Sequence, residues 1–277
     1  MKNITHISSA KKFNIYFFKE IIRYKDLFFR LVLKDIYVLY KQTVLGFSWA
    51  IIRPFLSMVV FTFVFGNLAN IPSDGIPYPI FSYAALVPWT YFSSALQKSN
   101  TSLISNIPVF TKVYFPRILL PLSPIISSLV DFFIAISILF LMFFAYDIQI
   151  NSNIIFLPLL LLMLVLTCSG FGMFLSVLAI QYRDFRHFVP FFITIMMYVS
   201  PVVWPASKIL EKFGEQAYIL YGFYPLSGII EGFRSAMIGH NPMPWQLIIP
   251  SIISSVFLFF FGLIFFTKQE KYIADVY

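Results

Sequence analysis

The chain is organised as long apolar runs separated by short polar connections. An α-helix rises about 1.5 Å per residue, so about 20 predominantly apolar residues cross the hydrocarbon core of a bilayer. Six stretches qualify by this measure: residues 44–67, 79–103, 118–146, 154–180, 187–204 and 245–267. The pattern therefore predicts an all-α integral membrane protein with six transmembrane helices.

Residues 1–43 are also rich in apolar side chains, but they hold too many charges to cross a membrane. Charged positions between residues 19 and 41 follow one another at steps of three, four or seven, which places them on one face of a helix. We predict an amphipathic helix on the inner leaflet, with a simple basic membrane anchor as the alternative. The basic residues of that face are Lys19, Arg23, Arg30, Lys34 and Lys41.

Residues 206–239 do not fit the six-span pattern. Their two apolar pieces are each too short to span, and they are separated at Tyr224 and Pro225. A single crossing here would export Lys268 and Lys271, against the tendency of basic residues to remain in the cytoplasm. We therefore predict a pair of re-entrant half-helices on the extracytoplasmic side, before the last span.

The distribution of basic residues predicts the orientation of the chain. Sixteen of the 20 Lys and Arg residues fall in residues 1–43, in the connections at 98–117 and 181–187, and after residue 267. By the positive-inside rule, both termini are cytoplasmic. We expect an N-terminal cytoplasmic segment at 1–43, a six-span domain at 44–267 and a cytoplasmic tail at 268–277.

Composition excludes several classes of function. Charged residues make up 12% of the chain, whereas soluble proteins have roughly a quarter. The single Cys and three widely separated His residues offer no metal-ligand spacing. No Gly-Lys dipeptide occurs, so the chain lacks a Walker A phosphate loop. We expect no catalytic residue, metal or cofactor in this chain, and no nucleic-acid partner.

Five strings occur in order along nearly the whole chain: LYKQTVLGFSWAIIRPFLSMVVFTFVFGNLA at 39–69, LVPWTYFSSALQKSNTSLISN at 86–106, TKVYFPRILLPL at 111–122, YRDFRH at 182–187 and YPLSGIIEGFR at 224–234. Together they resemble the membrane subunits of ABC exporters for O-antigen, capsule and teichoic acid polymers. The resemblance implies a homodimeric permease in the bacterial cytoplasmic (inner) membrane, surrounded by membrane lipids. It also implies two separate subunits that bind ATP and Mg²⁺, and a polyprenyl-diphosphate-linked glycan as the exported substrate.

Two other classes of protein remain open. A drug- or lipid-exporting ABC permease would have the same architecture. An integral membrane transferase acting on polyprenyl-linked sugars would share the hydrophobicity and the basic cytoplasmic face, but we would expect acidic or His clusters in its cytoplasmic loops. Those loops contain only Asp184 outside the terminal segments.

The connection at 104–117 is the predicted site of contact with an ATPase. Prolines limit its flexing, aromatic rings can seat in a pocket of the partner, and basic groups can meet acidic groups or lipid phosphates. The alternative is that its basic residues only follow the positive-inside rule. The predicted coupling residues are Pro108, Phe110, Lys112, Tyr114, Phe115, Pro116 and Arg117.

Four charged residues lie within apolar segments and are candidates for the pathway. Arg53 and Asp131 are expected at similar depths in the first and third spans, so they can pair, directly or through water, near the pathway, where Arg53 could also attract a diphosphate. Equally open is that Arg53 snorkels to the inner leaflet while Asp131 bonds hydroxyl groups. Glu231 and Arg234 are three residues apart and can meet on one helical face, either as a surface ion pair or as part of a gate.

Aromatic residues are the predicted lining of the pathway. Sugar rings pack their CH faces on aromatic rings, so a glycan can cross without many fixed charges. Aromatic residues near span ends are otherwise typical of an interfacial belt. The candidates are Trp49 and Phe92 on the first two spans, Tyr198 and Trp204 on the fifth, and Tyr224 at the break between the half-helices.

Overall fold

The computed structural model describes residues 21–41, 48–148, 151–238 and 242–276, and within them every regular element is a helix. The described helices are α2 (Lys25–Lys41), α3 (Trp49–Phe61), the π-helix η2 (Thr62–Leu68), α4 (Tyr78–Ser105), α5 (Ile107–Phe110), α6 (Leu119–Ser127), α7 (Leu129–Ala145), the 3-10 helix η3 (Ser152–Phe156), α8 (Leu157–Gln181), α9 (Phe185–Val199), α10 (Ser207–Gly222), α11 (Pro225–Ile238) and α12 (Trp245–Val276). The all-α prediction is confirmed for this part of the chain. Lys19 of the predicted basic face lies outside it.

Four helical segments are long and apolar enough to cross a membrane: Trp49–Leu68, Leu119–Ala145, Ser152–Gln181 and Trp245–Glu270. They match four of the six predicted spans. The other two predictions fall on α9, which has only 15 residues, and on α4, which has 28 residues but includes many hydroxyl and amide side chains.

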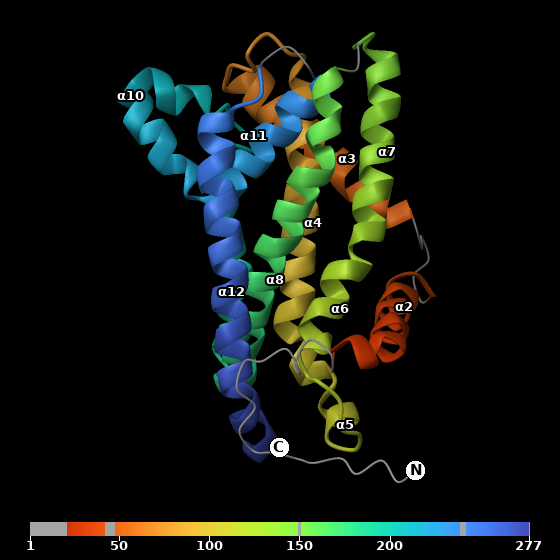
Figure 1. Ribbon diagram of the computed structural model, residues 1–277. Helices are drawn as coiled ribbons and strands as arrows, with labels where there is room; N and C mark the ends of the chain where they lie inside the picture. Colours follow the sequence, from red (N-terminus) through yellow and green to blue (C-terminus); the bar gives the residue numbers. More distant parts are fainter. Residues whose placement is uncertain (1–20, 42–47, 149–150, 239–241, 277) are drawn as a thin grey trace.

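The long helices α4, α8 and α12 lie side by side and form the centre of the bundle (Figure 1). Glycine allows α8 and α12 to approach closely: a Cβ atom added at Gly170 would lie 2.4 Å from the backbone oxygen of Leu258, and one at Gly262 would lie 2.2 Å from the oxygen of Gly170. Small residues at such crossings are the usual means of bringing membrane helices into contact. The α8–α12 crossing therefore depends on these two positions.

Helix α2 packs on α6 (Figure 1). Leu31 and Val32 are buried in this contact, whereas Phe29, Tyr37 and Val38 are exposed. An exposed apolar surface beside exposed basic residues is the pattern of a helix at a membrane interface. The contact with α6 was not predicted, because the sequence pattern distinguishes the faces of α2 but does not identify its neighbour.

The helices α10 and α11 lie at the upper end of the molecule in Figure 1, and α5 and the end of α12 lie at the lower end. The break between α10 and α11 falls at residues 223–224, and it overlaps the predicted break at Tyr224 and Pro225. All 14 residues of α11 are buried, but α10 is mostly exposed and kinks at Gly214, which has a positive φ of 82°. The two helices thus have different environments.

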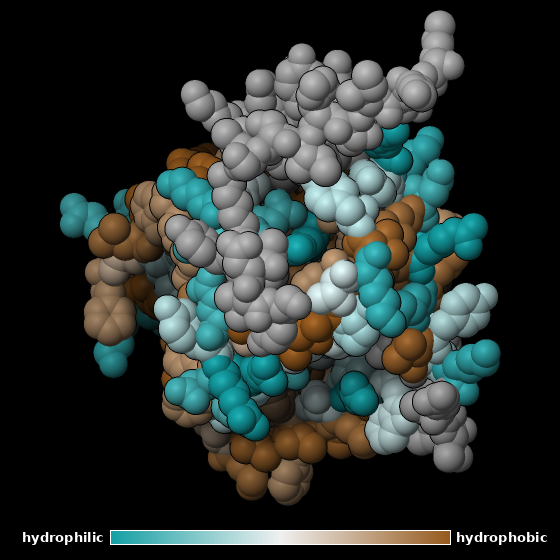
Figure 2. Space-filling view, turned by 90° about the horizontal axis from the view of Figure 1, so that it is seen from below, coloured by the Kyte–Doolittle hydropathy of each residue, from teal (hydrophilic) through white to brown (hydrophobic). Residues whose placement is uncertain are grey.

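The expected tail at 268–277 continues α12 as a helix to Val276. Viewed from the lower end, the coloured part of the face mixes hydrophilic and apolar side chains, and the apolar ones gather toward its left and lower edges (Figure 2). Hydrophilic side chains at this end suit an aqueous or headgroup environment.

Candidate functional site

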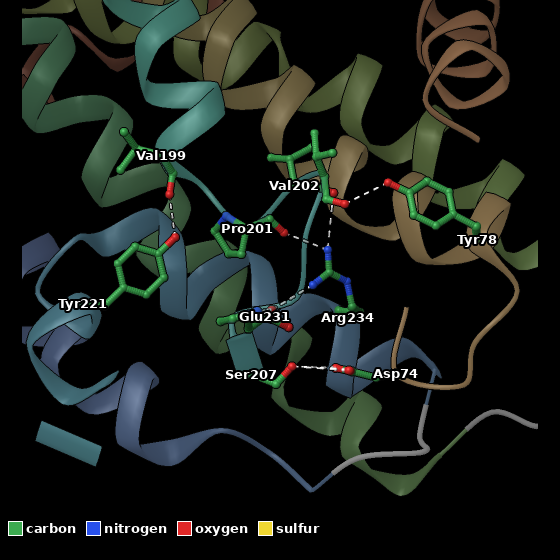
Figure 3. A network of polar contacts seen from close by, with 11 residues as sticks. Asp74, Tyr78, Val199, Pro201, Val202, Ser207, Tyr221, Glu231 and Arg234 are labelled. Carbon is green, nitrogen blue, oxygen red and sulfur yellow. Dashed lines mark hydrogen bonds and ion pairs between the residues drawn. The ribbon is translucent and has the colours of Figure 1, made fainter. Parts of the chain in front are cut away.

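A buried ion pair holds the connection between α9 and α10, at the upper end of the molecule (Figure 3). Arg234 donates from Nη1 to Glu231 Oε1 at 2.8 Å and from Nη2 to the Pro201 carbonyl at 2.7 Å. The same Glu231 oxygen accepts the backbone N–H of Ala206 at 2.5 Å. The Arg234 guanidinium also lies over the ring of Phe81, 3.7 Å from its centroid.

The contact between Glu231 and Arg234 that the spacing allowed is therefore present, but it is not on the surface. Only 4% of Arg234 and 8% of Glu231 are exposed. Burying two charges is unfavourable unless their remaining polar atoms find partners, and here backbone groups supply several of them. The pair fixes the path of residues 201–206 relative to α11.

Tyrosine hydroxyl groups hold the same region from other sides. Tyr78 of α4 donates to the Val203 carbonyl at 2.8 Å, and Tyr221 of α10 donates to the Val199 carbonyl at 2.6 Å (Figure 3). Tyr224 donates to the Met196 carbonyl at 3.0 Å. The end of α9 and the connection that follows it are thus held by α4, α10 and α11, which favours a rigid rim over a loose loop.

The predicted aromatic residues occupy different environments. Tyr198 is 66% exposed and Trp49 is 38% exposed. Trp204 stacks on Tyr221 with 5.8 Å between ring centroids. Phe92 is fully buried, with its ring against Trp89 and Phe171. Phe92 is therefore a core residue of this chain, and its burial argues against the prediction that it lines a pathway.

Arg53 and Asp131 line one cavity of about 320 Å³ between α3, α4 and α7. Within the described chain they do not pair with each other. Asp131 instead lies 3.6 Å from the Nζ atom of Lys98 and accepts a hydrogen bond from Tyr40. The Arg53 guanidinium lies over the Trp49 ring, 5.4 Å from its centroid. A direct ion pair between Arg53 and Asp131 is therefore absent, although both residues line the same cavity.

Sequence reasoning missed the polar contacts that fasten α2 and α4 to the bundle. Ser123 of α6 donates to Asp35 at 2.6 Å, and Lys34 donates to the side chain of Asn106 at 2.7 Å. Burial raises the pKa of the Asp35 carboxyl group, and the Ser123 hydrogen bond opposes this shift. The sequence offered a signal only for the neighbouring contact between Lys98 and Asp131. Lys98 is a charge within an apolar stretch, and such a charge needs a partner at that depth.

The predicted coupling residues divide into two groups. Phe110 and Phe115 are buried in a cluster formed with α2, α6, α8 and α12, so they support the loop from inside. Tyr114 is 64% exposed and Lys112 is also exposed. Of the two prolines, Pro108 is exposed and Pro116 is buried.

Arg117 connects residues 104–117, here named the coupling loop after its predicted role, to the end of α12. Its backbone N–H donates to Glu270 Oε1 at 3.1 Å, and its Nη1 atom donates to the Glu270 carbonyl at 3.3 Å. Its guanidinium lies 4.9 Å from the centroid of the Phe110 ring. Displacement of the loop would therefore act directly on α12.

No group of three or more His, Cys, Asp or Glu residues suited to a metal ion occurs among the described residues. The all-helical bundle with several long apolar helices is the architecture of an integral membrane protein. The model of the ABC-2 type transporter family matches residues 26–238, and the chain belongs to that family.

The chain is also similar to curated proteins over most of its length. It is 23% identical over 261 residues to the O-antigen export system permease protein RfbA of Myxococcus xanthus, covering 93% of this chain and 98% of that protein. It is 27% identical over 252 residues to a protein of the same name from Klebsiella pneumoniae, covering 91% and 95%. The polysialic acid transport protein KpsM of Escherichia coli is 23% identical over 212 residues, covering 75% and 79%.

Proposed function

We propose that this chain is the membrane half of an ATP-driven exporter that moves a lipid-linked, O-antigen-like polysaccharide from the cytoplasm across the inner membrane. The alignment with O-antigen export permeases over nearly the full length of both chains carries this proposal. The family match and the apolar helical bundle are consistent with it.

Six spans with both termini in the cytoplasm are part of the proposal. Helix α4 passes through the centre of the bundle, and 19 of its residues are buried. Several of its polar side chains, including Ser82, Ser99 and Asn100, are buried against protein, an arrangement that membrane helices tolerate. Helix α9 is short but lies between the cytoplasmic connection at 181–187 and the rim at 200–206. In this orientation α10 and α11 form the re-entrant extracytoplasmic pair.

The partners proposed are a second copy of this chain and two ATPase subunits that bind ATP and Mg²⁺. Arg53 is exposed on α3 in the single copy, and a charge at that depth should face protein, water or a charged ligand. A polyprenyl-diphosphate group is a ligand of matching charge. The exposed residues Lys112 and Tyr114 form the proposed contact with an ATPase subunit.

The exposed residues Tyr198 and Trp49 and the partly buried Trp204 are the proposed lining of the pathway, and Tyr224 is the proposed support of the rim. Removing Tyr198 or Trp204 by substitution with Ala should reduce surface polymer at matched membrane abundance. Normal export from both variants, with both sites labelled as lipid-facing, would instead indicate an aromatic belt.

The decisive experiment is deletion of the gene in its own bacterium, followed by complementation. We expect surface polysaccharide to disappear and the completed lipid-linked glycan to accumulate inside the cell. Complementation should require both this chain and an active ATPase partner. A deletion that leaves the lipid-linked glycan incomplete would favour the membrane transferase, and a normal surface polymer with altered drug resistance would favour the drug exporter.

A further inference from the structure

A second cavity, of about 590 Å³, lies at the upper end of the molecule, beside the Glu231–Arg234 pair. Its wall is built from α10, α11, the start of α12 and the connection before α4. The volume is within the range of about 300–1,000 Å³ that is typical of small-molecule sites. The aromatic pathway proposed above does not use this cavity.

Three residues in the wall are more than nine-tenths buried and still have polar atoms without partners. Glu231 uses only Oε1 in its hydrogen bonds, and its Oε2 atom accepts none from the described residues. Ser235, one turn further along α11, and Tyr218 of α10 are each 9% exposed, and neither hydroxyl group has a hydrogen-bond partner within the described ranges. None of these three oxygen atoms is itself shut off from solvent, so each is available in the cavity to bond water or a polar ligand.

The rest of the wall narrows the chemistry of that ligand. Asp74 adds a second carboxylate, and Figure 3 shows it close to Ser207 and on the same side as Glu231. The wall has no Lys or Arg among its described residues. Arg234 balances the charge of Glu231, but the carboxylate of Asp74 has no Lys or Arg beside it in the wall. This unbalanced negative charge disfavours a phosphate or an acidic sugar and favours groups that donate hydrogen bonds.

Apolar side chains also line the cavity, among them Met243 and Trp245. Trp245 is 40% exposed, with its ring held edge-on by Phe156 at 5.0 Å between centroids. An aromatic ring in the same cavity as hydroxyl and carboxylate groups is suited to a sugar ring, whose CH groups can pack on the indole while its hydroxyl groups donate to the carboxylates.

We infer that this cavity is a saccharide-binding site for a neutral or amino sugar unit, formed by Tyr218, Glu231, Ser235 and Trp245. Its assignment to the exported glycan on the extracytoplasmic side rests on the proposed function. The inference that the cavity binds a sugar does not rest on the proposed function.

The test measures binding directly, by saturation-transfer NMR on the full-length chain in phosphatidylcholine nanodiscs, with maltose, glucosamine and glucuronate as probes. We expect transfer to maltose and glucosamine and little to glucuronate. The double variant Tyr218→Phe/Ser235→Ala should bind about tenfold more weakly, since it loses two neutral hydrogen bonds, and Trp245→Leu should also lose binding. Because these hydroxyl groups make no internal hydrogen bond, the double variant should fold normally.

Ser137→Ala, on the exposed face of α7, is the matched control and should bind like the unchanged chain. The inference is overturned if the double variant retains full binding, if glucuronate binds equally well, or if ethanolamine displaces the sugars, which would indicate a lipid headgroup site. The NMR experiment measures sugar binding and the deletion experiment measures export. Sugar binding can therefore be absent while export is supported, and sugar binding can be present while export is not.

Discussion

At the scale of residues, the ion pair between Glu231 and Arg234 is the clearest case of single side chains that fix the local structure. Each side chain is buried and each charge is compensated mainly by the other and by backbone groups of residues 201–206. Such a pair adds little net stability over apolar residues, but the loss of one partner leaves an uncompensated charge in a medium of low dielectric constant. Its contacts favour a positioning role at the rim.

Substituting Arg234 alone by Met should lower the free energy of unfolding by about 3–5 kcal/mol, because Glu231 is then buried without its partner. The double variant Glu231→Gln/Arg234→Met should recover part of this loss. The measurement is thermal unfolding of the purified chain in detergent. If the double variant is as unstable as the sum of both single variants, the two charges do not act as a pair.

Asp131 gives a second test at the residue scale, because its nearest cation is Lys98 rather than Arg53. Reversing either Lys98 or Asp131 should lower membrane abundance, since a lone charge at this depth costs at least about 2.5 kcal/mol. The exchange Lys98→Asp/Asp131→Lys should restore abundance in part. The exchange Arg53→Asp/Asp131→Arg should restore none, and equal recovery from both exchanges would contradict this assignment.

At the scale of elements, the coupling loop combines an anchored half with an exposed half. Phe110 and Phe115 are held in the core, Arg117 is held by Glu270, and Tyr114 faces outward. An element arranged in this way can pass a displacement from a partner to α12. The aromatic residues of the loop therefore have separable roles.

Tyr114→Ala should leave membrane abundance unchanged and reduce export per ATP hydrolysed, since an exposed contact is lost. Phe115→Ala should instead destabilise the chain by about 3–5 kcal/mol, the usual effect of removing a buried Phe. Export, ATPase activity and abundance are measured together in reconstituted complexes. Normal coupling in the Tyr114 variant would remove this residue from the proposed contact.

The crossing of α8 and α12 is a second feature at this scale. Gly170→Ala or Gly262→Ala should each cost about 1–3 kcal/mol, because the added methyl group meets backbone atoms that cannot move independently. Ala145→Val, at an exposed position of α7, adds carbon atoms without such a clash and should have little effect. Thermal unfolding of the three variants provides the comparison.

At the scale of the whole molecule, the segment formed by α3 and η2 (Trp49–Leu68) is covered least among the four long apolar segments. Only 11% of the residues in its apolar part are buried, compared with 33% or 39% in the other three long apolar segments. It also presents the exposed Arg53. Helix α9 is likewise exposed along much of its length, including Tyr198. A second copy that covers these helices would shield the charge and enclose the aromatic residues.

Cysteine cross-linking tests this arrangement. In a Cys168→Ser background, Val60→Cys on α3 and Ile195→Cys on α9 should give dimers with a bifunctional thiol reagent in native membranes. Phe144→Cys on α7, which replaces a side chain that is 80% exposed, should not. Strong cross-linking at position 144 and none at positions 60 and 195 would place the second copy elsewhere.

The sequence alone determined those features of this protein that depend on interactions between residues close together in the chain. Hydrophobic length defined the long apolar helices, and the fixed φ of Pro225 marked the start of α11, because these properties depend on neighbouring residues only. The spacing of Glu231 and Arg234 likewise allowed their contact, since residues three apart share a helical face.

Tertiary structure alone decided the partners of residues far apart in the chain. Asp131 pairs with Lys98, and Arg117 with Glu270, across 33 and 153 residues of sequence. It also placed Phe92, Phe110 and Phe115 inside the bundle while leaving Tyr114 outside. In a chain this apolar, hydrophobicity does not distinguish a side chain that faces lipid from one that faces protein, because both environments are equally free of water.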